Sequence, residues 1–292
     1  MTAEGRIEWN ANRLDAIMAR MAAMRPCGST GFASLDSVLG GGLYPEVYVL
    51  AAEPGAGKTT LALQIADHVA RFGSRKVVFL SSEMSAPQVV AKSISRMSAE
   101  SSRALTAREV MRMDAENLDA VSGAVEAYRR EVAPNMATLD EPLSAEEVAA
   151  LYESALDPGE PAPVLVVDYL QILPGREDAV QTDLQHHTAS MGALCSVAKR
   201  FRTPVVVISS LNRSGRVSVA LSSLAGSSAI EYSASVVLFV SVDGTGDEAK
   251  ANREAAVRPV TVSVLKNRFG RVGDVPMYFK PSESRFIERA ER

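Results

Sequence analysis

The feature that most constrains this chain is a glycine-rich loop between an apolar run and a helix-forming segment. The loop follows residues 47–51, precedes residues 59–72, and reads Ala52-Glu53-Pro54-Gly55-Ala56-Gly57-Lys58-Thr59-Thr60. In such a loop, backbone N–H groups surround phosphate oxygens, and the N-terminus of the next helix adds positive potential. We expect Lys58 to reach the β- and γ-phosphates and the Thr59 hydroxyl to ligate Mg²⁺. Ala52 replaces the first consensus glycine, and a chance glycine-rich turn is the alternative, but the strand–loop–helix context favours a phosphate site.

Two acidic residues follow other apolar runs. Asp168 ends Val164-Leu165-Val166-Val167, and Glu83 follows residues 77–82. An acid at the carboxyl end of a strand beside a phosphate loop is where the magnesium shell is held, so Asp168 is a second candidate metal residue. Glu83 is a candidate to polarise the attacking water. The alternatives are that Asp168 caps a strand and that Glu83 caps the helix beginning near Ser85.

The apolar runs predict an α/β fold with a mostly parallel sheet. Residues 47–51, 76–80, 164–167 and 205–208 are nearly continuous apolar runs, typical of strands buried on both faces. Helix-forming segments lie between them, at residues 59–72, 86–97, 106–130, 145–156 and 184–201. Further strands are expected at 236–240, 260–266, 275–280 and 285–288, the last three antiparallel and joined by a glycine-containing turn at 267–273. The polar segment 243–259 predicts an exposed loop or a short mobile helix.

Charge and cysteine content exclude several classes of protein. The 31 Lys and Arg against 35 Asp and Glu give a formal net charge of −4, which excludes a histone-like binder but not a locally basic channel. Cys27 and Cys195 lie far apart without a CxxC pattern, so we expect neither a disulfide scaffold nor a structural zinc site. With no signal sequence and no apolar stretch near the ~20 residues of a membrane span, a cytoplasmic protein is predicted.

Several further segments, taken in order along the chain, point to a family. They are Thr30-Gly31-Phe32, Leu35-Asp36, Gly41-Gly42-Leu43, the phosphate loop, Phe79 to Ala86, Asp168-Tyr169-Leu170-Gln171, Ser209 to Ser214, Ser228 to Glu231 and Lys266 to Gly270. This order resembles the RecA-like motor domain of DnaB-type replicative helicases over residues 28–288. The resemblance implies that Glu83 is the catalytic glutamate, acting with Lys58. It also implies that Lys266 and Arg268 act on the γ-phosphate in the site of the neighbouring subunit.

The resemblance also sets expectations for assembly and partners. It implies a hexameric ring that hydrolyses ATP at subunit interfaces and translocates 5′→3′ on single-stranded DNA, with a primase or a loader as a possible partner. Residues 1–27 correspond to the linker helix that docks on the next subunit, although packing on its own domain is the alternative. Residues 28–292 form the motor, and the collar domain of the family is expected to be absent.

The chain departs from the family pattern in its DNA-facing elements. Ser210 stands where the family has a glutamine that senses the γ-phosphate. At the pore loop the charged Arg-Glu-Ser-Gly is replaced by Ala225, Gly226, Ser227 and Ser228. Backbone amides there can still hold phosphate oxygens, and Arg213 and Arg216 are candidates to replace the missing charge.

Three functions follow from these matches and departures. The first is a ring-forming helicase-like motor. The second is a RecA-like recombination or repair ATPase that binds single strands without unwinding duplex DNA, which the Ser210 and Ala225 departures allow. The third is a nucleotide-switched assembly or regulatory protein that binds no DNA, which the acidic net charge favours.

Overall fold

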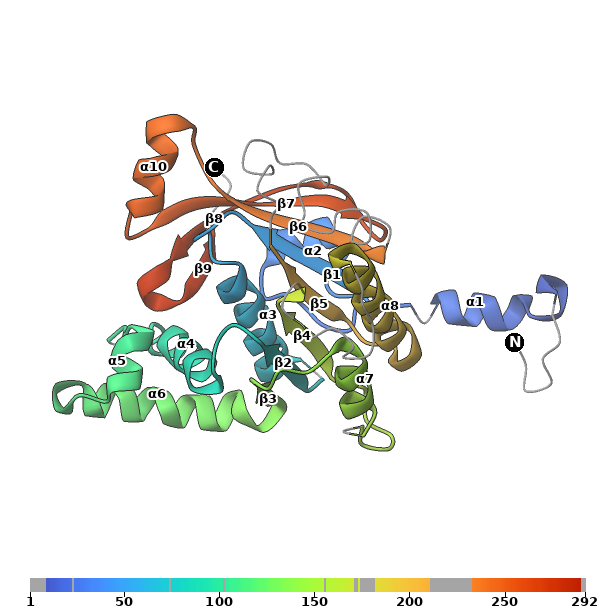
Figure 1. Cartoon of the computed structure of the whole chain (residues 1–292), viewed down its shortest axis with the longest axis horizontal. Helices are drawn as coiled ribbons and strands as arrows, with labels where there is room; N and C mark the ends of the chain where they lie inside the picture. Colours follow the sequence, from blue (N-terminus) through green and yellow to red (C-terminus); the bar gives the residue numbers. More distant parts are fainter. Residues whose placement is uncertain are drawn as a thin grey trace.

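A mixed β-sheet runs through the middle of the molecule, with helices on both faces (Figure 1). The computed structural model describes residues 9–22, 24–73, 75–101, 103–154, 156–170, 173, 182–210 and 233–289. Within these residues, nine strands lie in the order β3-β2-β4-β5-β1-β6-β7-β8-β9. The strands are β1 (Val47–Ala52), β2 (Val77–Ser81), β3 (Met136–Leu139), β4 (Val164–Asp168), β5 (Val205–Ser209), β6 (Val236–Val242), β7 (Arg258–Asn267), β8 (Gly273–Lys280) and β9 (Arg285–Glu288).

The strands from β3 to β6 form the parallel part of the sheet. Strand β1 lies at its centre, with β5 on one side and β6 on the other. Every residue of β1, β4 and β5 is buried, which confirms the prediction drawn from their continuous apolar runs. Parallel strands end at a common edge, so the segments that follow β1, β2, β4 and β5 meet there.

The remaining strands are antiparallel, as predicted. Strand β7 pairs with β6, β8 with β7, and β9 with β8. Burial alternates along β8, which is typical of an antiparallel strand with one face against the core. This hairpin carries Lys266 and Arg268 in and just after β7.

Helices pack on both faces of the sheet, and a further group of helices extends to one side. The helices are α1 (Leu14–Ala22), α2 (Ala33–Leu39), α3 (Lys58–Phe72), α4 (Ala86–Ser98), α5 (Ala107–Arg112), α6 (Leu118–Glu131), α7 (Ala145–Ser154), α8 (Asp183–Phe201) and α10 (Gly246–Glu254), with 3₁₀ turns η1 (Asn10–Asn12), η2 (Ala115–Asn117), η3 (Ala133–Asn135) and η7 (Pro281–Glu283). One apolar core packs α2, α3 and α4 on one face, and a second packs α7 and α8 on the other. Helices α4, α5 and α6 share a third apolar cluster and lie together at one side of the molecule in Figure 1.

The single helix predicted over residues 106–130 is wrong. Helix α5 ends at Arg112, and Met113 adopts a left-handed conformation with φ 50°. The turn η2 follows before α6 begins. Val110 of α5 and Val121 of α6 lie on either side of the break and belong to the same cluster. The strand pattern also missed β3, a four-residue strand with no fully buried position.

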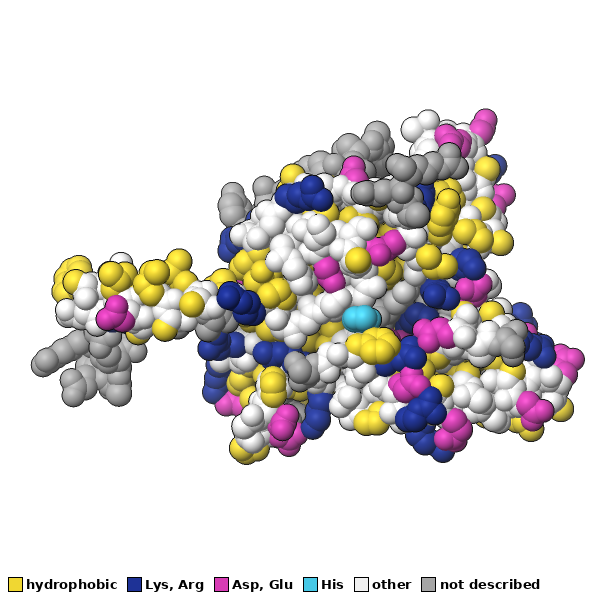
Figure 2. Space-filling model, turned by 180° about the vertical axis from the view of Figure 1, so that it is seen from behind, with side chains coloured by type: hydrophobic (Ala, Val, Ile, Leu, Met, Phe, Trp, Pro, Cys, Tyr) yellow, Lys and Arg dark blue, Asp and Glu magenta, His cyan; other side chains and the backbone are white. Residues whose placement is uncertain are grey.

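Helix α1 projects from the side of the molecule, within the segment predicted to be helical (Figure 1). Apolar side chains lie along it in Figure 2, and Leu14, Met18 and Met21 are each more than half exposed. Among the described residues, the helices are too short or too polar to cross a bilayer.

Candidate active site

The phosphate loop owes its shape to two glycines. Gly55 and Gly57 have φ of 77° and 94°, in the left-handed region that favours glycine. A Cβ on Gly57 would lie 2.9 Å from the rings of Phe279 and Phe286, so this position also lacks room for a side chain. These two rings stack with centroids 4.6 Å apart. Strands β8 and β9 therefore pack against the loop through these two rings. Helix α3 begins directly after the loop, at Lys58.

Two arginines also hold the loop. Arg253 of α10 forms an ion pair with Glu53 at 2.6 Å, and Arg258 at the start of β7 donates from Nη1 to the Gly55 carbonyl at 3.0 Å. Segment 243–259, predicted to be an exposed loop or short helix, contains the exposed helix α10 and the start of β7. Its contacts to the loop were not predicted, because they join residues about 200 positions apart in sequence.

Glu83 lies beside the phosphate loop and does not cap α4. Its carboxylate is 3.4 Å from the Lys58 Nζ. Helix α4 is capped by Ser85, whose N–H donates to the Gln88 side chain at 2.9 Å. The strand that precedes Glu83 is paired with β4, with Ser81 in register with Asp168. The structure thus brings together Lys58, Glu83 and Asp168 from three separate segments.

Asp168 is a buried carboxylate beside Thr59 and Lys58. Among the described residues, neither of its oxygens has a partner with good hydrogen-bond geometry. Burial raises its pKa to about 6, and the Thr59 side chain and the Lys58 ammonium oppose this shift. An unpartnered buried charge is costly, so the arrangement suits a cation bound at this point. Thr59 and Asp168 supply the oxygen donors that Mg²⁺ prefers.

The donor set also fits Mg²⁺ in number. Over the described ranges, no group of three or more His, Cys, Asp or Glu side chains is close enough to hold a metal ion. Mg²⁺ in nucleotide sites is usually bound by one or two protein groups, with water and substrate phosphates completing its shell. One carboxylate and one hydroxyl therefore match this ion.

Lys92 is a cation at the site that the sequence patterns do not reveal. It lies on α4, and its Nζ donates to the Thr60 Oγ1 at 3.3 Å. Burial lowers its pKa, while the charges of Asp168 and Glu83 oppose this shift. No motif marks Lys92. Its place at the site depends on the packing of α4 against α3, which brings it to Thr60.

Ser210 and the two hairpin cations lie at different ends of the sheet. Ser210 directly follows β5, between β1 and β4, and so lies at the phosphate edge. Lys266 pairs with Val237, and the Arg268 N–H donates to the Ser235 carbonyl. Both contacts lie in the first part of β6. Along the strand, Val237 is about 10 Å and Ser235 about 17 Å from Val240, the partner of Ala52 at the end of β1. The predicted residues Arg213, Arg216, Ala225, Gly226 and Ser228 lie outside the described residues.

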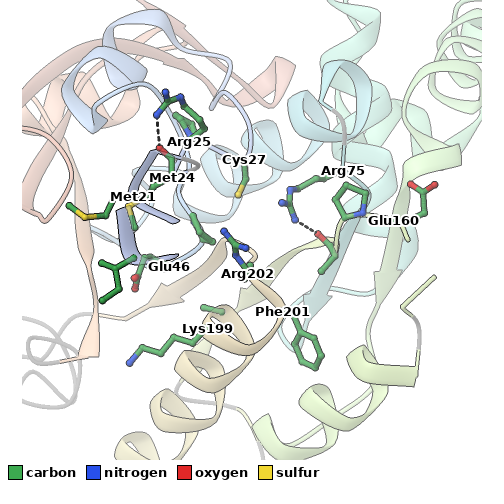
Figure 3. Close-up of a pocket in the computed structure, with 16 residues that line it drawn as sticks. Met21, Met24, Arg25, Cys27, Glu46, Arg75, Glu160, Lys199, Phe201 and Arg202 are labelled. Carbon is green, nitrogen blue, oxygen red and sulfur yellow. Dashed lines mark hydrogen bonds between the residues drawn. The ribbon is translucent and has the colours of Figure 1, made fainter. Parts of the chain in front are cut away.

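A pocket of about 880 Å³ lies at this opposite edge. Figure 3 shows it between Met21 and Met24, which belong to α1 and the segment after it, and Arg75, Lys199 and Arg202 of the body. It is separated from the phosphate loop by the length of the central strands, so it is not the nucleotide site.

The fold and this site define a RecA-like core with a phosphate-binding loop. The family model of the DnaB-like helicase C-terminal domain matches residues 28–288. The chain therefore belongs to the DnaB-like helicase C-terminal domain family.

Relatives and solved structures agree with this assignment. The replicative DNA helicase DnaB of Pasteurella multocida is 26% identical over 271 residues, which cover 90% of this chain and 56% of that protein. The probable plasmid replicative DNA helicase of Chlamydia muridarum is 28% identical, with 88% of this chain and 54% of that protein covered. The chain thus spans about half the length of these relatives. The ATPase domain of G40P matches 98% of this chain with a TM-score of 0.80 and 20% identity, which supports the fold.

Proposed function

We propose that this chain is an ATP-hydrolysing motor that works on single-stranded DNA. The observation that carries the proposal is the meeting of Lys58, Glu83 and Asp168 at the carboxyl edge of the sheet, around a loop shaped for phosphates. The similarity to replicative helicases adds DNA as the partner. The chain spans about half of those proteins, and its own residues support hydrolysis of ATP at this edge.

In the proposed reaction, the loop amides and Lys58 bind the β- and γ-phosphates of ATP. Mg²⁺, held by Thr59 and Asp168, supplies positive charge to the phosphate oxygens when bound. Without nucleotide, the Lys58 ammonium pairs with Glu83. When Lys58 turns to the phosphates, Glu83 is released to accept a proton from the attacking water. Lys92, next to Thr60, adds a second positive charge near the γ-phosphate.

Hydrolysis is proposed to require a neighbouring subunit. Lys266 and Arg268 lie at the edge of the sheet opposite to their own phosphate loop. They reach a phosphate loop when a second copy places its carboxyl edge against this hairpin. A head-to-tail contact of this kind closes into a ring, for which we propose a hexamer. A guanidinium supplied in this way stabilises transition-state charge and makes hydrolysis depend on assembly.

Residues 1–27 are proposed to serve as the linker that joins neighbouring subunits. A projecting helix with exposed Leu14, Met18 and Met21 has an apolar face that its own body leaves uncovered. Docking of that face on the next copy would strengthen the same ring. Residues 28–292 form the motor, and a primase is a candidate partner because one similar structure is of a DnaB-like replicative helicase and its interactions with primase.

A single experiment separates the proposed motor from its alternatives. The ATPase rate is measured with and without single-stranded DNA, together with the native mass and strand displacement in the 5′→3′ direction. Stimulation by DNA in a ring, with displacement, supports the motor. Stimulation without displacement supports the recombination or repair ATPase, which the departures at Ser210 and Ala225 allow. Hydrolysis without any DNA effect supports the nucleotide switch.

The assignment of Glu83 has its own test. Glu83→Gln should retain nucleotide binding and lose most turnover, about 10²-fold or more, because only proton transfer from water is removed. Nucleotide affinity and steady-state hydrolysis are measured on the same preparation. Turnover at the wild-type rate would reject Glu83 as the base.

A further inference from the structure

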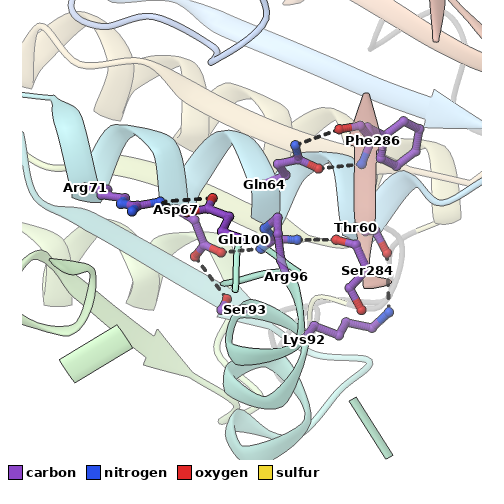
Figure 4. A network of polar contacts seen from close by, with 10 residues as sticks. All are labelled: Thr60, Gln64, Asp67, Arg71, Lys92, Ser93, Arg96, Glu100, Ser284 and Phe286. Carbon is purple, nitrogen blue, oxygen red and sulfur yellow. Dashed lines mark hydrogen bonds and ion pairs between the residues drawn. The ribbon is translucent and has the colours of Figure 1, made fainter. Parts of the chain in front are cut away.

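A buried ion pair joins the phosphate-loop helix to the helix that follows Glu83. Asp67 of α3 and Arg96 of α4 form it, and their side chains are only 9% and 7% exposed. Ser93 donates to the second carboxylate oxygen of Asp67 at 3.0 Å. The other terminal nitrogen of Arg96 donates to the Ser284 carbonyl, in the turn before β9 (Figure 4). Each charged group therefore has two polar partners inside the protein.

The pair is the deeper of two contacts between the same two helices. Near the phosphate loop, Lys92 donates to Thr60. Asp67 lies seven residues after Thr60 on α3, and Arg96 lies four residues after Lys92 on α4, so each follows on the same face of its helix. Two contacts at different heights fix both the distance and the rotation of α4 against α3. Because α4 begins three residues after Glu83, its placement determines where that carboxylate lies.

Strand β9 connects this pair to the loop itself. Gln64 of α3 donates to the Phe286 carbonyl at 3.0 Å and accepts from the Phe286 N–H at 2.7 Å. The Phe286 ring, stacked on Phe279, is the surface against which Gly57 packs. The contact from Arg96 to Ser284 therefore ties α4 to the strand that supports the phosphate loop.

The energetics of buried pairs indicate what this one does. Replacing a buried ion pair by apolar residues of similar size is often neutral or stabilising, whereas removing one partner is strongly destabilising. A contribution to the free energy of folding is therefore a weak reason for such a pair to be present. Its hydrogen bonds are directional, so they can fix how one helix lies against another. We propose that Asp67 and Arg96 are positioning residues, which hold α4 so that Glu83 and Lys92 meet the bound phosphates. This inference rests on the proposed hydrolysis of ATP by Glu83.

A double variant of the whole chain, Asp67→Leu with Arg96→Met, separates position from stability. It replaces both charged side chains by apolar ones of similar volume. Its thermal unfolding midpoint should therefore equal or exceed that of the wild type. The Kd for ATP should stay within about threefold, while kcat should fall about 10-fold to 100-fold, because a shift of about 1 Å at the reacting groups has an effect of this size. A folded double variant with wild-type kcat would overturn the proposal.

The matched control is an exposed bridge across the same helices. Arg71 of α3 donates to both oxygens of Glu100, just after α4, at 3.1 and 2.9 Å. The Glu100 side chain is 46% exposed. Glu100→Gln should leave kcat within about twofold of wild type, because an exposed pair of this kind contributes little. A kcat loss in Glu100→Gln equal to that of the double variant would also count against the inference, since any helix contact would then have the same effect.

A conservative variant keeps the test decisive if the double variant does not fold. Arg96→Lys can retain the pair with Asp67 but cannot reach Asp67 and Ser284 together, because one ammonium replaces two separate nitrogens. We expect kcat between those of the wild type and the double variant, with the Kd for ATP unchanged, and a wild-type kcat would reject the role of the Ser284 contact. A wild-type protein without ATPase activity would instead overturn the proposed function, and this inference with it.

Discussion

The two edges of the central sheet carry different parts of the proposed chemistry. At the carboxyl edge lie the phosphate loop, Glu83 and Asp168, which together can bind a nucleotide and a metal ion. Towards the amino edge lie Lys266 and Arg268, which we propose act on a nucleotide bound by another copy. In this proposal one subunit carries both parts of a complete site, but the two parts meet only between subunits. The proposed mechanism therefore requires several copies to assemble.

Strand β7 spans both edges. It begins with Arg258, which donates to the Gly55 carbonyl of its own phosphate loop, and it contains Lys266 near its other end. One continuous strand therefore connects the phosphate loop of a subunit with the cation that we propose acts on the next subunit. Variants at each edge, and then at this connection, separate the three contributions.

The largest effect is expected at the amino edge. Arg268→Ala should reduce hydrolysis about 10³-fold, with nucleotide affinity less affected, because charge stabilisation in the transition state is lost. Subunits carrying Glu83→Gln are then mixed with subunits carrying Arg268→Ala, each nearly inactive alone. Interfaces that combine an intact Glu83 with an intact Arg268 should recover activity. Well-mixed oligomers without recovery would show that Arg268 does not act across an interface.

At the carboxyl edge, Asp168→Asn should have opposite effects on activity and stability. Hydrolysis dependent on Mg²⁺ should fall about 10²-fold, because the carboxylate ligand is lost. The nucleotide-free protein should gain about 1–2 kcal/mol at pH 8, where the wild-type carboxylate is both ionised and buried. Because the folded pKa of Asp168 is raised to about 6, the gain should shrink as the pH falls below 6 and both side chains become neutral.

Urea unfolding from pH 5 to pH 8 measures this gain. The control is Asp157→Asn, at an exposed ion pair with Lys76, which should change stability by less than about 0.5 kcal/mol at each pH. A gain in Asp168→Asn that does not depend on pH would contradict the assignment of a buried ionised carboxylate.

A smaller effect is expected at the pore loop, whose residues lie outside those described. With Ala225 and Gly226 in place of a charged pair, binding of single-stranded DNA should depend weakly on salt. Ala225→Arg should steepen the log–log salt slope by about 0.7 for each additional phosphate that an arginine neutralises. Arg213→Ala should flatten it if that residue supplies the charge. Absence of ATP-dependent binding at low salt, in both the wild type and Ala225→Arg, would leave the nucleotide switch as the better function.

The smallest effect is expected at the connection between the edges. Arg253→Gln removes an ion pair that is partly exposed, so the Kd for ATP should change less than about threefold. Arg258→Met removes a hydrogen bond to the loop backbone and should weaken ATP binding more than Arg253→Gln does. Equal effects, measured by nucleotide titration, would show that Arg258 does not hold the loop.

The phosphate loop and the buried strands can be predicted from short continuous segments of the sequence. A strand, a glycine loop and a helix are encoded in one short continuous segment, so the phosphate loop can be located from the order of residues alone. The continuous apolar runs predicted β1, β4 and β5, because burial on both faces leaves no polar alternation. Glu83 and Asp168 were found because each ends such a run, and parallel strands end at one edge. The break after Met113 was missed, because one residue with positive φ leaves no periodic signal.

Which distant residues meet is settled by the packed fold and not by any local pattern. Lys92, Arg258 and the buried pair of Asp67 and Arg96 have no motif, and their partners lie on other elements, up to about 200 positions away. Those contacts depend on the register of β7 against β6 and on the packing of α4 against α3, which are settled by the whole core. The same register places Lys266 and Arg268 at the far edge of the sheet. A local pattern can specify a cation in a hairpin, but its distance from the phosphate loop is fixed only when the strands pair.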